Sequence, residues 1–269
     1  MRDLFRQRGL ILVAAVVAVL TGRVDTLTVG QSPERLQLFL LAGQSNMAGR
    51  GELADEDLAP HPRVWAFDRD RRWQPAVDPI HFDKPIAAVG PGRSFGLAIA
   101  RAFPDAHVGL IPAAVGGSPI SAWRPGVRYD ETGAFPWDEA IARVKEALRD
   151  GELKAILWHQ GESDAKADAA PEYEARLRDL ISRFRTTLGD PELPFLVGQL
   201  GRFPGRPWDR WWEQVDAAHR RVAADTRNVV FVSSAGLADK GDHLHFSAEA
   251  ARELGARYAR AYLDLTGQR

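Results

Sequence analysis

The sequence predicts an α/β protein of three layers (α/β/α), in which helices cover both faces of a central parallel sheet of about five strands. Two observations lead to this fold class. Short apolar runs alternate along the chain with amphipathic segments of helical period, and the connections between them are short. No internal repeat or low-complexity segment interrupts this alternation. One domain, residues 35–269, therefore accounts for the pattern.

Five short apolar runs are expected to form the strands of this sheet. Each run is bounded by glycine, proline or polar residues, as buried strands commonly are. The runs are residues 38–41 (LFLL), 107–111 (HVGLI), 153–158 (LKAILW), 194–200 (PFLVGQL) and 228–233 (NVVFVS).

The helices are predicted from apolar residues that recur three and four positions apart. Trp137, Ile141 and Val144 recur at i, i+4 and i+7, which places them on one face of a helix. Gly189 stands just past the end of one predicted helix, and Ser247 opens the last one. The predicted helices are residues 94–103, 137–148, 173–188, 208–222 and 247–265.

Residues 52–91 differ from this pattern. The segment is rich in proline, aspartate and aromatic residues and has no helical period. We interpret it as a long excursion over the sheet edge that helps to wall a site. It contains one short strand-like run at residues 64–67 (VWAF), and its tryptophans are expected to pack rather than to contact a ligand.

The composition excludes several classes of protein. With 269 residues and 45% hydrophobic content, the chain can bury a full core without disulfides or structural metals. The 35 lysines and arginines balance 36 aspartates and glutamates, giving a net charge of −1, so the basic field that a nucleic acid partner requires is missing. The sequence contains no cysteine, which removes thiolate metal sites and cysteine nucleophiles.

The N-terminus is typical of an exported protein, either secreted or periplasmic. Three arginines precede an apolar segment at residues 10–20, which is short for a membrane span. We expect residues 1–23 to form a signal peptide. Because no A-x-A-like cleavage site precedes Thr21, an uncleaved membrane anchor at residues 9–20 is the alternative, and a buried or amphipathic helix is a third. Residues 24–34 are interpreted as a polar linker.

The first predicted strand leads into the candidate nucleophile. Residues 38–41 run into a tight turn that displays Ser45 at the carboxyl end of the strand. Ligands bind at this edge of an open parallel sheet. The turn is not the G-x-S-x-G elbow of α/β-hydrolases, because Met47 stands where the second glycine belongs. Capping of the following helix is the alternative role for Ser45.

Two more predicted strands end in polar, glycine-containing turns. Gly116 and Gly117 follow residues 107–111, and a glycine pair allows free backbone amides to come close to a ligand. The turn HQGESD at residues 159–164 follows the next strand. Each turn alone is compatible with an ordinary connection to a helix. Their recurrence after three consecutive strands favours one site at this edge of the sheet.

The loop before the last helix supplies a candidate base. Asp242 and His245 are three positions apart, so the carboxylate can reach imidazole Nδ1 locally while Nε2 faces Ser45. A serine nucleophile requires such a base and an acid that orients it. The alternatives are a solvated loop or a metal site formed by His243 and His245 with Asp242 or Asp239.

Four blocks of the sequence resemble the SGNH/GDSL hydrolase superfamily. They are GQSNMAG (43–49), VGGSPISAW (115–123), WHQGESD (158–164) and DHLH (242–245), in order within residues 36–262. They are most similar to the acetylesterase branch, which groups carbohydrate esterase family six acetylxylan esterases with sialate O-acetylesterase-like proteins. The resemblance implies the flavodoxin-like SGNH hydrolase fold.

The resemblance also implies site residues. Ser45 matches the nucleophile, His245 the base and Asp242 its acid. The oxyanion donors would be the amides of Ser45 and Gly117 together with the side chain of Gln160. This glutamine departs from the asparagine that gives the superfamily its name.

Glu162, in the same block as Gln160, is expected to support the imidazole or the turn. The implied activity is that of a serine esterase that removes O-acetyl groups from a carbohydrate through an acyl-enzyme. The resemblance implies no metal and no organic cofactor.

Two other functions are weighed against this one. The first is an esterase of the same superfamily that acts on lipid or aryl esters, which would require a long apolar groove. The second is a carbohydrate-binding protein without catalysis, which would have no need of a serine, an aspartate and a histidine together. The sequence leaves open whether the substrate is acetylxylan, an acetylated sialic acid or another glycan, and which oligomer forms.

Overall fold

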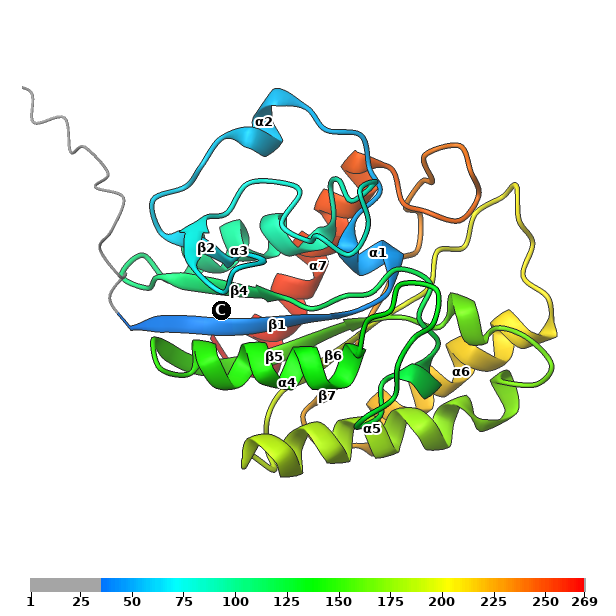
Figure 1. The fold of residues 1–269 in the computed structure, drawn as a ribbon. Helices are drawn as coiled ribbons and strands as arrows, with labels where there is room; N and C mark the ends of the chain where they lie inside the picture. The colour runs from blue at the N-terminus through cyan, green and yellow to red at the C-terminus, as the bar shows by residue number, and fades with distance from the viewer. Residues whose placement is uncertain (1–34, 269) are drawn as a thin grey trace, which may run out of the picture. The chain divides into compact units, whose positions relative to one another are not determined.

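The computed structural model describes residues 35–268 (Figure 1). The strands are β1 (Leu36–Gly43), β2 (Val64–Phe67), β3 (Trp73–Pro75), β4 (Val108–Pro112), β5 (Gly151–His159), β6 (Phe195–Gly198) and β7 (Val229–Val232). The helices are α1 (Ser45–Ala48), α2 (Asp55–Leu58), α3 (Pro91–Ala102), α4 (Pro136–Ala147), α5 (Tyr173–Leu188), α6 (Arg210–Asp225) and α7 (Ala248–Leu265). Three short 3₁₀ turns are η1 (Ile120–Ala122), η2 (Glu162–Asp164) and η3 (Ala170–Glu172).

The expected signal peptide or anchor at residues 1–23 and the linker at residues 24–34 lie outside the described residues, so they stay predictions. Among the helices of residues 35–268, none has both the length and the apolar character needed to cross a bilayer.

The strands form one sheet in the order β3-β2-β4-β1-β5-β6-β7. Every neighbouring pair is parallel except β2 and β3. The predicted α/β class with a parallel sheet is therefore confirmed. The five apolar runs correspond to β1, β4, β5, β6 and β7.

The sheet has two strands more than expected. β2 is the VWAF run, which pairs with β4 and extends the sheet rather than lying in a loop. β3 contains only three residues, of which Gln74 and Pro75 are exposed. It pairs antiparallel with β2 and closes this edge of the sheet. Three residues are too few to show an alternating hydrophobic pattern, and they form a strand only because they pair with β2.

The alternation of side chains along β1 divides the core into two layers. Leu38 and Leu40 face one side of the sheet and pack in the cluster that includes α4, α5 and α6. Phe39 and Leu41 face the other side and pack in the cluster that includes α1, α3 and α7. Successive side chains of a strand point to opposite faces, so one buried strand serves both layers. Figure 1 shows the two groups of helices on opposite sides of the sheet.

The topology brings four turns to one edge of the sheet. β1 lies between β4 and β5, so the turns that follow these three strands are neighbours. The loop after β7 starts at the far end of the sheet and leads into α7. Because α7 packs against α3 and α3 packs against α1, the chain returns to the centre of the sheet before α7 begins (Figure 1). Ser247 caps α7, as expected, by accepting from the Ala250 amide.

Gly43 allows β1 and β5 to meet at this edge. Its φ angle is +131°, and a Cβ at this position would lie 2.1 Å from the His159 carbonyl oxygen. No other residue fits so close to the neighbouring backbone. The position of Ser45, two residues further on, therefore depends on this glycine.

Two histidines are completely buried between the sheet and the helices. Burial lowers the pKa of both His159 and His219 to about 3. His219 Nε2 lies 3.0 Å from the Tyr173 hydroxyl, and His159 Nδ1 lies 3.2 Å from the Tyr258 hydroxyl. Both imidazoles are therefore neutral, hydrogen-bonded parts of the folded core.

We predict that the free energy of unfolding falls as the pH is lowered from about 6.5 toward 3. The unfolded chain binds protons at these two histidines in that interval, whereas the folded protein does not. Each histidine contributes up to about 1.4 kcal/mol per pH unit. Urea unfolding at a series of pH values measures this slope. A His219→Gln variant should have a shallower slope, and equal slopes for the two proteins would contradict the prediction.

Candidate active site

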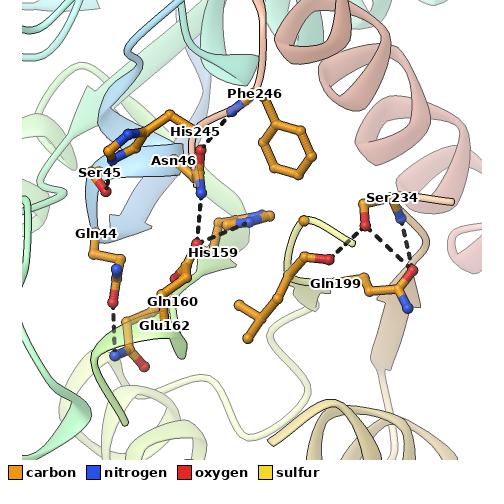
Figure 2. Close-up of polar contacts among 12 residues, drawn as sticks. Gln44, Ser45, Asn46, His159, Gln160, Glu162, Gln199, Ser234, His245 and Phe246 are labelled. Atoms are coloured by element: carbon orange, nitrogen blue, oxygen red, sulfur yellow. Dashed lines mark hydrogen bonds and ion pairs between the residues drawn. The ribbon is translucent and has the colours of Figure 1, made fainter. Parts of the chain in front are cut away.

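Ser45 is the first residue of α1, and only Gln44 separates it from the end of β1. The Gln44 amide donates to the His159 carbonyl at 2.9 Å, which joins this turn to the end of β5. The amides of Met47 and Ala48 donate to the Gln44 carbonyl and close the short helix. Ser45 is 8% exposed. The structure thus holds one serine in a fixed turn at the carboxyl edge of the central strand (Figure 2).

His245 and Asp242 lie beside this serine. The Ser45 Oγ and His245 Nε2 atoms are 3.0 Å apart, and His245 Nδ1 and Asp242 Oδ2 are 2.8 Å apart. The carboxylate of Asp242 accepts from Nδ1–H, so Nε2 is left to accept from the serine hydroxyl. The three residues form a continuous chain of hydrogen bonds from the β7–α7 loop to α1.

The loop also stabilises the ionised form of Asp242. Partial burial alone would raise the pKa of this carboxyl. The opposing contributions come from the His245 amide at 2.8 Å, the His245 imidazole and the Leu244 amide at 3.0 Å, and together they hold the pKa well below its usual range. Lys240 Nζ lies 3.5 Å from the same carboxylate. Asp242 is therefore an anion beside the imidazole.

Two backbone amides in the turns after β1 and β4 are available to a ligand. In the described part of the chain, the amides of Ser45 and Gly117 donate to no protein acceptor. Gly117 has a φ angle of +87°, and its carbonyl accepts from Ser163 Oγ at 2.7 Å. This bond joins the turn after β4 to the turn after β5. Glycine is suited to this conformation, which few other residues adopt.

The expected oxyanion role of Gln160 is not supported by its hydrogen bonds. The side chain is fully buried, and its Nε2 atom donates to Asp164 Oδ2 at 2.6 Å and to Gln44 Oε1 and the Ser118 carbonyl at 3.1 Å. Its Oε1 atom accepts from the Tyr173 hydroxyl at 2.9 Å. Both hydrogens of the Gln160 side-chain amide are therefore donated to acceptors within the protein. Two of these acceptors come from other segments of the chain, so the sequence block alone could not show them.

The neighbouring Gln44 was missed by the sequence analysis. Its Oε1 atom accepts from Gln160 Nε2 and, at 3.4 Å, from the Ser163 amide. This fixes the orientation of the Gln44 side-chain amide and leaves its Nε2 hydrogens without an acceptor among residues 35–268. Its position directly before Ser45 was the available signal.

Glu162 does not contact the imidazole of His245. Its Oε1 atom accepts from Asn46 Nδ2 at 2.6 Å, and Asn46 in turn bonds the backbone of the β7–α7 loop (Figure 2). Burial raises the pKa of Glu162 despite the bond from Asn46. Its support of the site thus reaches the loop through Asn46, a second residue that the sequence analysis did not single out.

Comparison with known proteins identifies the family. A family model described as "Carbohydrate esterase, sialic acid-specific acetylesterase" matches residues 35–264, which is most of the chain. The chain belongs to this family of carbohydrate esterases. It is accordingly a carboxylic ester hydrolase of the class that acts on acetylated carbohydrates. The resemblance to the acetylesterase branch is confirmed.

Two relatives have names that agree with the family. A protein named "Probable carbohydrate esterase" from Arabidopsis thaliana is 33% identical over 85% of this chain and 90% of its own length. A protein named "Probable 9-O-acetyl-N-acetylneuraminic acid deacetylase" from Escherichia coli is 23% identical over 66% of this chain and 67% of its own length.

Solved structures share the fold. A crystal structure of an Arabidopsis thaliana protein has a TM-score of 0.75 and 32% identity, and it covers 86% of this esterase and 98% of that chain. The crystal structure of NanS has a TM-score of 0.73 and 19% identity, with 89% of this esterase and all of that chain covered. The second comparison supports the fold alone.

Polar side chains of the esterase form a wall beside Gly117. A Cβ at position 117 would lie 2.8 Å from the Tyr129 hydroxyl and 3.3 Å from Glu131 Oε2. Lys84 Nζ lies 4.0 Å from Glu131 Oε2. Two of these residues belong to the loop between η1 and α4, and Lys84 belongs to the excursion over residues 52–91 that was expected to wall a site. The wall carries a hydroxyl, a carboxylate and an ammonium group.

The alternative metal site is not formed in the described residues. Among residues 35–268, no group of three or more histidines, aspartates and glutamates is arranged to hold a metal ion. The two histidines pair with different carboxylates: His243 Nδ1 lies 2.7 Å from Asp239 Oδ2, and His245 Nδ1 lies 2.8 Å from Asp242 Oδ2. His243 has a φ angle of +57°, in the left-handed region of backbone conformation.

We predict that the Asp242 carboxyl of this esterase stays ionised at pH values below about 4, where an ordinary aspartate takes up its proton. Three hydrogen bonds from one loop stabilise its anion. Carbon-13 NMR of the side-chain carboxyl at a series of pH values follows the titration. A His245→Ala variant loses the imidazole bond but keeps both amide bonds, so its Asp242 pKa should rise toward the usual value. An ordinary aspartate titration in the unaltered protein would contradict this account.

Proposed function

We propose that the protein removes O-acetyl groups from a carbohydrate through an acyl-enzyme formed on Ser45. The observation that carries the proposal is the hydrogen-bonded chain Ser45–His245–Asp242, with distances of 3.0 and 2.8 Å. A serine hydroxyl in contact with an imidazole, itself oriented by a carboxylate, is the arrangement that activates a serine nucleophile. Membership in a carbohydrate esterase family agrees with this chemistry.

In the acylation step, His245 Nε2 takes the hydroxyl proton of Ser45 while Oγ attacks the acetyl carbonyl carbon. A carbon–oxygen bond forms and the carbonyl oxygen becomes an oxyanion. The bond to the sugar oxygen then breaks, and that oxygen leaves with the proton from His245. Asp242 stabilises the imidazolium that exists between these two transfers. The products are an alcohol and acetyl-Ser45.

In the deacylation step, a water molecule replaces the sugar. His245 takes a proton from the water as its oxygen attacks the acetyl carbon, and the second oxyanion forms. The bond between the acetyl carbon and Ser45 Oγ then breaks, and Oγ regains its proton from His245. Acetate leaves and the site returns to its starting state.

The oxyanion requires donors that are fixed before the reaction. We propose the amides of Ser45 and Gly117 as two of them, since neither has a protein acceptor within residues 35–268. For the third we propose Gln44 Nε2 in place of Gln160. Gln160 then has the supporting role of orienting the Gln44 amide through the 3.1 Å bond to its oxygen.

The polar wall beside Gly117 favours a sugar over a lipid as the alcohol part of the substrate. Tyr129, Glu131 and Lys84 can pair with hydroxyl groups but offer no apolar groove for a long chain. A carbohydrate-binding protein without catalysis has no use for a serine in contact with an imidazole. One relative's name gives an acetylated sialic acid as substrate and the other's gives only the class of carbohydrate esterase, so acetate release over a panel of acetylated sugars is the experiment that selects a substrate.

We predict that Ser45→Ala abolishes acetate release. The variant lacks the oxygen that forms the acyl-enzyme, so mass spectrometry should also show no covalent adduct with an organophosphate. Ser182→Ala, on the exposed face of α5, is the matched control and should behave as the unaltered protein. Acetyl esters should be cleaved faster than octanoyl esters. Full activity of Ser45→Ala would end the proposal, and preference for octanoyl esters would favour the lipid esterase.

We predict that Gln44→Ala lowers kcat by about 10²- to 10³-fold with a smaller change in KM, because an oxyanion donor acts mainly in the transition state. Steady-state kinetics on an acetyl ester measures both constants. Gln74→Ala, on the exposed edge strand β3, is the matched control and should change neither. An unchanged kcat in Gln44→Ala would show that the oxyanion does not use this side chain.

A further inference from the structure

We infer that Asn46 is a positioning residue for the catalytic base, because its side chain ties the backbone on both sides of His245 to α1. Asn46 Nδ2 donates to the Leu244 carbonyl at 3.0 Å, and the Phe246 amide donates to Asn46 Oδ1 at 3.1 Å. Asn46 follows Ser45 directly, so nucleophile and base are held from adjacent residues of one short helix. This inference rests on the proposed function.

Residues 239–246 of the β7–α7 loop make few other hydrogen bonds to the rest of the protein, whereas residues 233–235 bond Gln199, Leu200 and Arg257. The Lys240 amide donates to the His245 carbonyl, and the side chains of Asp239 and Asp242 also bond within residues 239–246. In the described part of the chain, the hydrogen bonds from residues 239–246 to other elements go to Ser45 and Asn46 alone. Without Asn46, Ser45 would be the remaining hydrogen-bonded partner of residues 239–246 outside the loop.

Residues 239–246 are packed against the protein at the Phe246 end more than at the Asp242 end. The Phe246 ring is 2% exposed and lies edge-on to His159 and Phe203, with ring centroids 5.6 and 5.4 Å away. Asp242 and His243 are exposed, and Leu244 is only half-buried. The bond from Asn46 to the Leu244 carbonyl therefore fixes the side of His245 that packing fixes least.

Glu162 determines which way the Asn46 amide points. Its Oε1 atom accepts from Asn46 Nδ2 at 2.6 Å, so the nitrogen faces Glu162 and Leu244 while the oxygen faces the Phe246 amide (Figure 2). If the Asn46 amide were flipped, its oxygen would face the Glu162 carboxyl oxygen and the Leu244 carbonyl, and its nitrogen would face the Phe246 amide, which is a donor. Asn46 is 3% exposed, so water cannot replace these partners at low cost.

His159 lies on the far side of Glu162 and makes a conservative test possible. The Tyr258 hydroxyl donates to the Trp158 carbonyl, so it accepts from His159 Nδ1–H and leaves Nε2 as a bare acceptor. This Nε2 lies 4.0 Å from Glu162 Oε1, the same oxygen that accepts from Asn46. A glutamine at position 162 can keep an oxygen at this place, and its amide nitrogen then takes the place of Oε2, which is buried without a partner among residues 35–268.

The test uses four variants and steady-state kinetics on an acetyl ester. We expect Asn46→Ala to lower kcat by about 10- to 100-fold with KM changed by less than about threefold, because a displaced base slows proton transfer without removing a substrate contact. Asn46→Asp should be at least as impaired, since it loses the donor to Leu244 and faces Glu162 with a second carboxyl. Glu162→Gln should stay within about threefold of the unaltered kcat, whereas Glu162→Ala should resemble Asn46→Ala.

A double variant and a control separate positioning from general stability. Asn46 and Glu162 act as one unit, so Asn46→Ala with Glu162→Ala should be no slower than the worse single variant. Asn228→Ala removes a half-buried asparagine that bonds Glu192 and precedes β7, away from Ser45 and His245, and should leave kcat unchanged. Thermal unfolding of each variant gives the folded fraction at the assay temperature, by which kcat is corrected.

Three outcomes would overturn the inference. They are an unchanged kcat in Asn46→Ala, a loss of kcat explained fully by the unfolded fraction, and equal impairment of Glu162→Gln and Glu162→Ala. The Ser45→Ala variant distinguishes failure of this inference from failure of the proposed function. If it is inactive while Asn46→Ala is fully active, the inference is wrong and the proposed function stands; if Ser45→Ala is active, the proposed function fails first.

Discussion

The hydrogen bond between Ser45 Oγ and His245 Nε2 joins residues that are 200 positions apart. This contact depends on how the strands and helices of the whole domain are arranged. β1 leads into the turn before Ser45 and lies at the centre of the sheet, where two neighbouring strands bring their turns to the same edge. The loop with His245 starts at the far end of the sheet. It reaches Ser45 because α7 packs against α3 and the chain returns across the sheet. A contact between such distant segments depends on both core layers.

Beneath this contact lies a network of buried polar side chains. Gln160, Asp164, Tyr173 and His219 bond to one another, and the Gln160 amide continues the network to Gln44. Burying polar groups is costly unless they find partners, so a network of this kind stabilises one arrangement of its members. Here it fixes the residue that precedes the nucleophile. We consider rigidity at this point to be its main contribution to the esterase.

The sequence predicted much of the fold and the set of turns that form the site. Apolar runs gave five strands, and the helical period gave the five long helices, because burial imposes these patterns locally. β3 could not be predicted, since its three residues become a strand only against β2. Ser45, Gly117, Asp242 and His245 were singled out from turn chemistry and from the resemblance. The structure brings them to one edge, and their catalytic roles belong to the proposal.

What the sequence determined by itself was the fold class and the chemical types at the sheet edge, since hydrophobic period and turn residues are local properties. The tertiary structure decided which side chains at this edge of the sheet keep hydrogen-bonding groups available to a ligand. Gln44 and Gln160 both lie in sequence blocks that resemble the superfamily. The Gln160 side-chain amide donates to buried acceptors, whereas the Gln44 side-chain nitrogen has no acceptor among residues 35–268. Asn46 likewise gained its partners only through folding. Hydrogen-bond partners come from distant segments, and no local pattern records them.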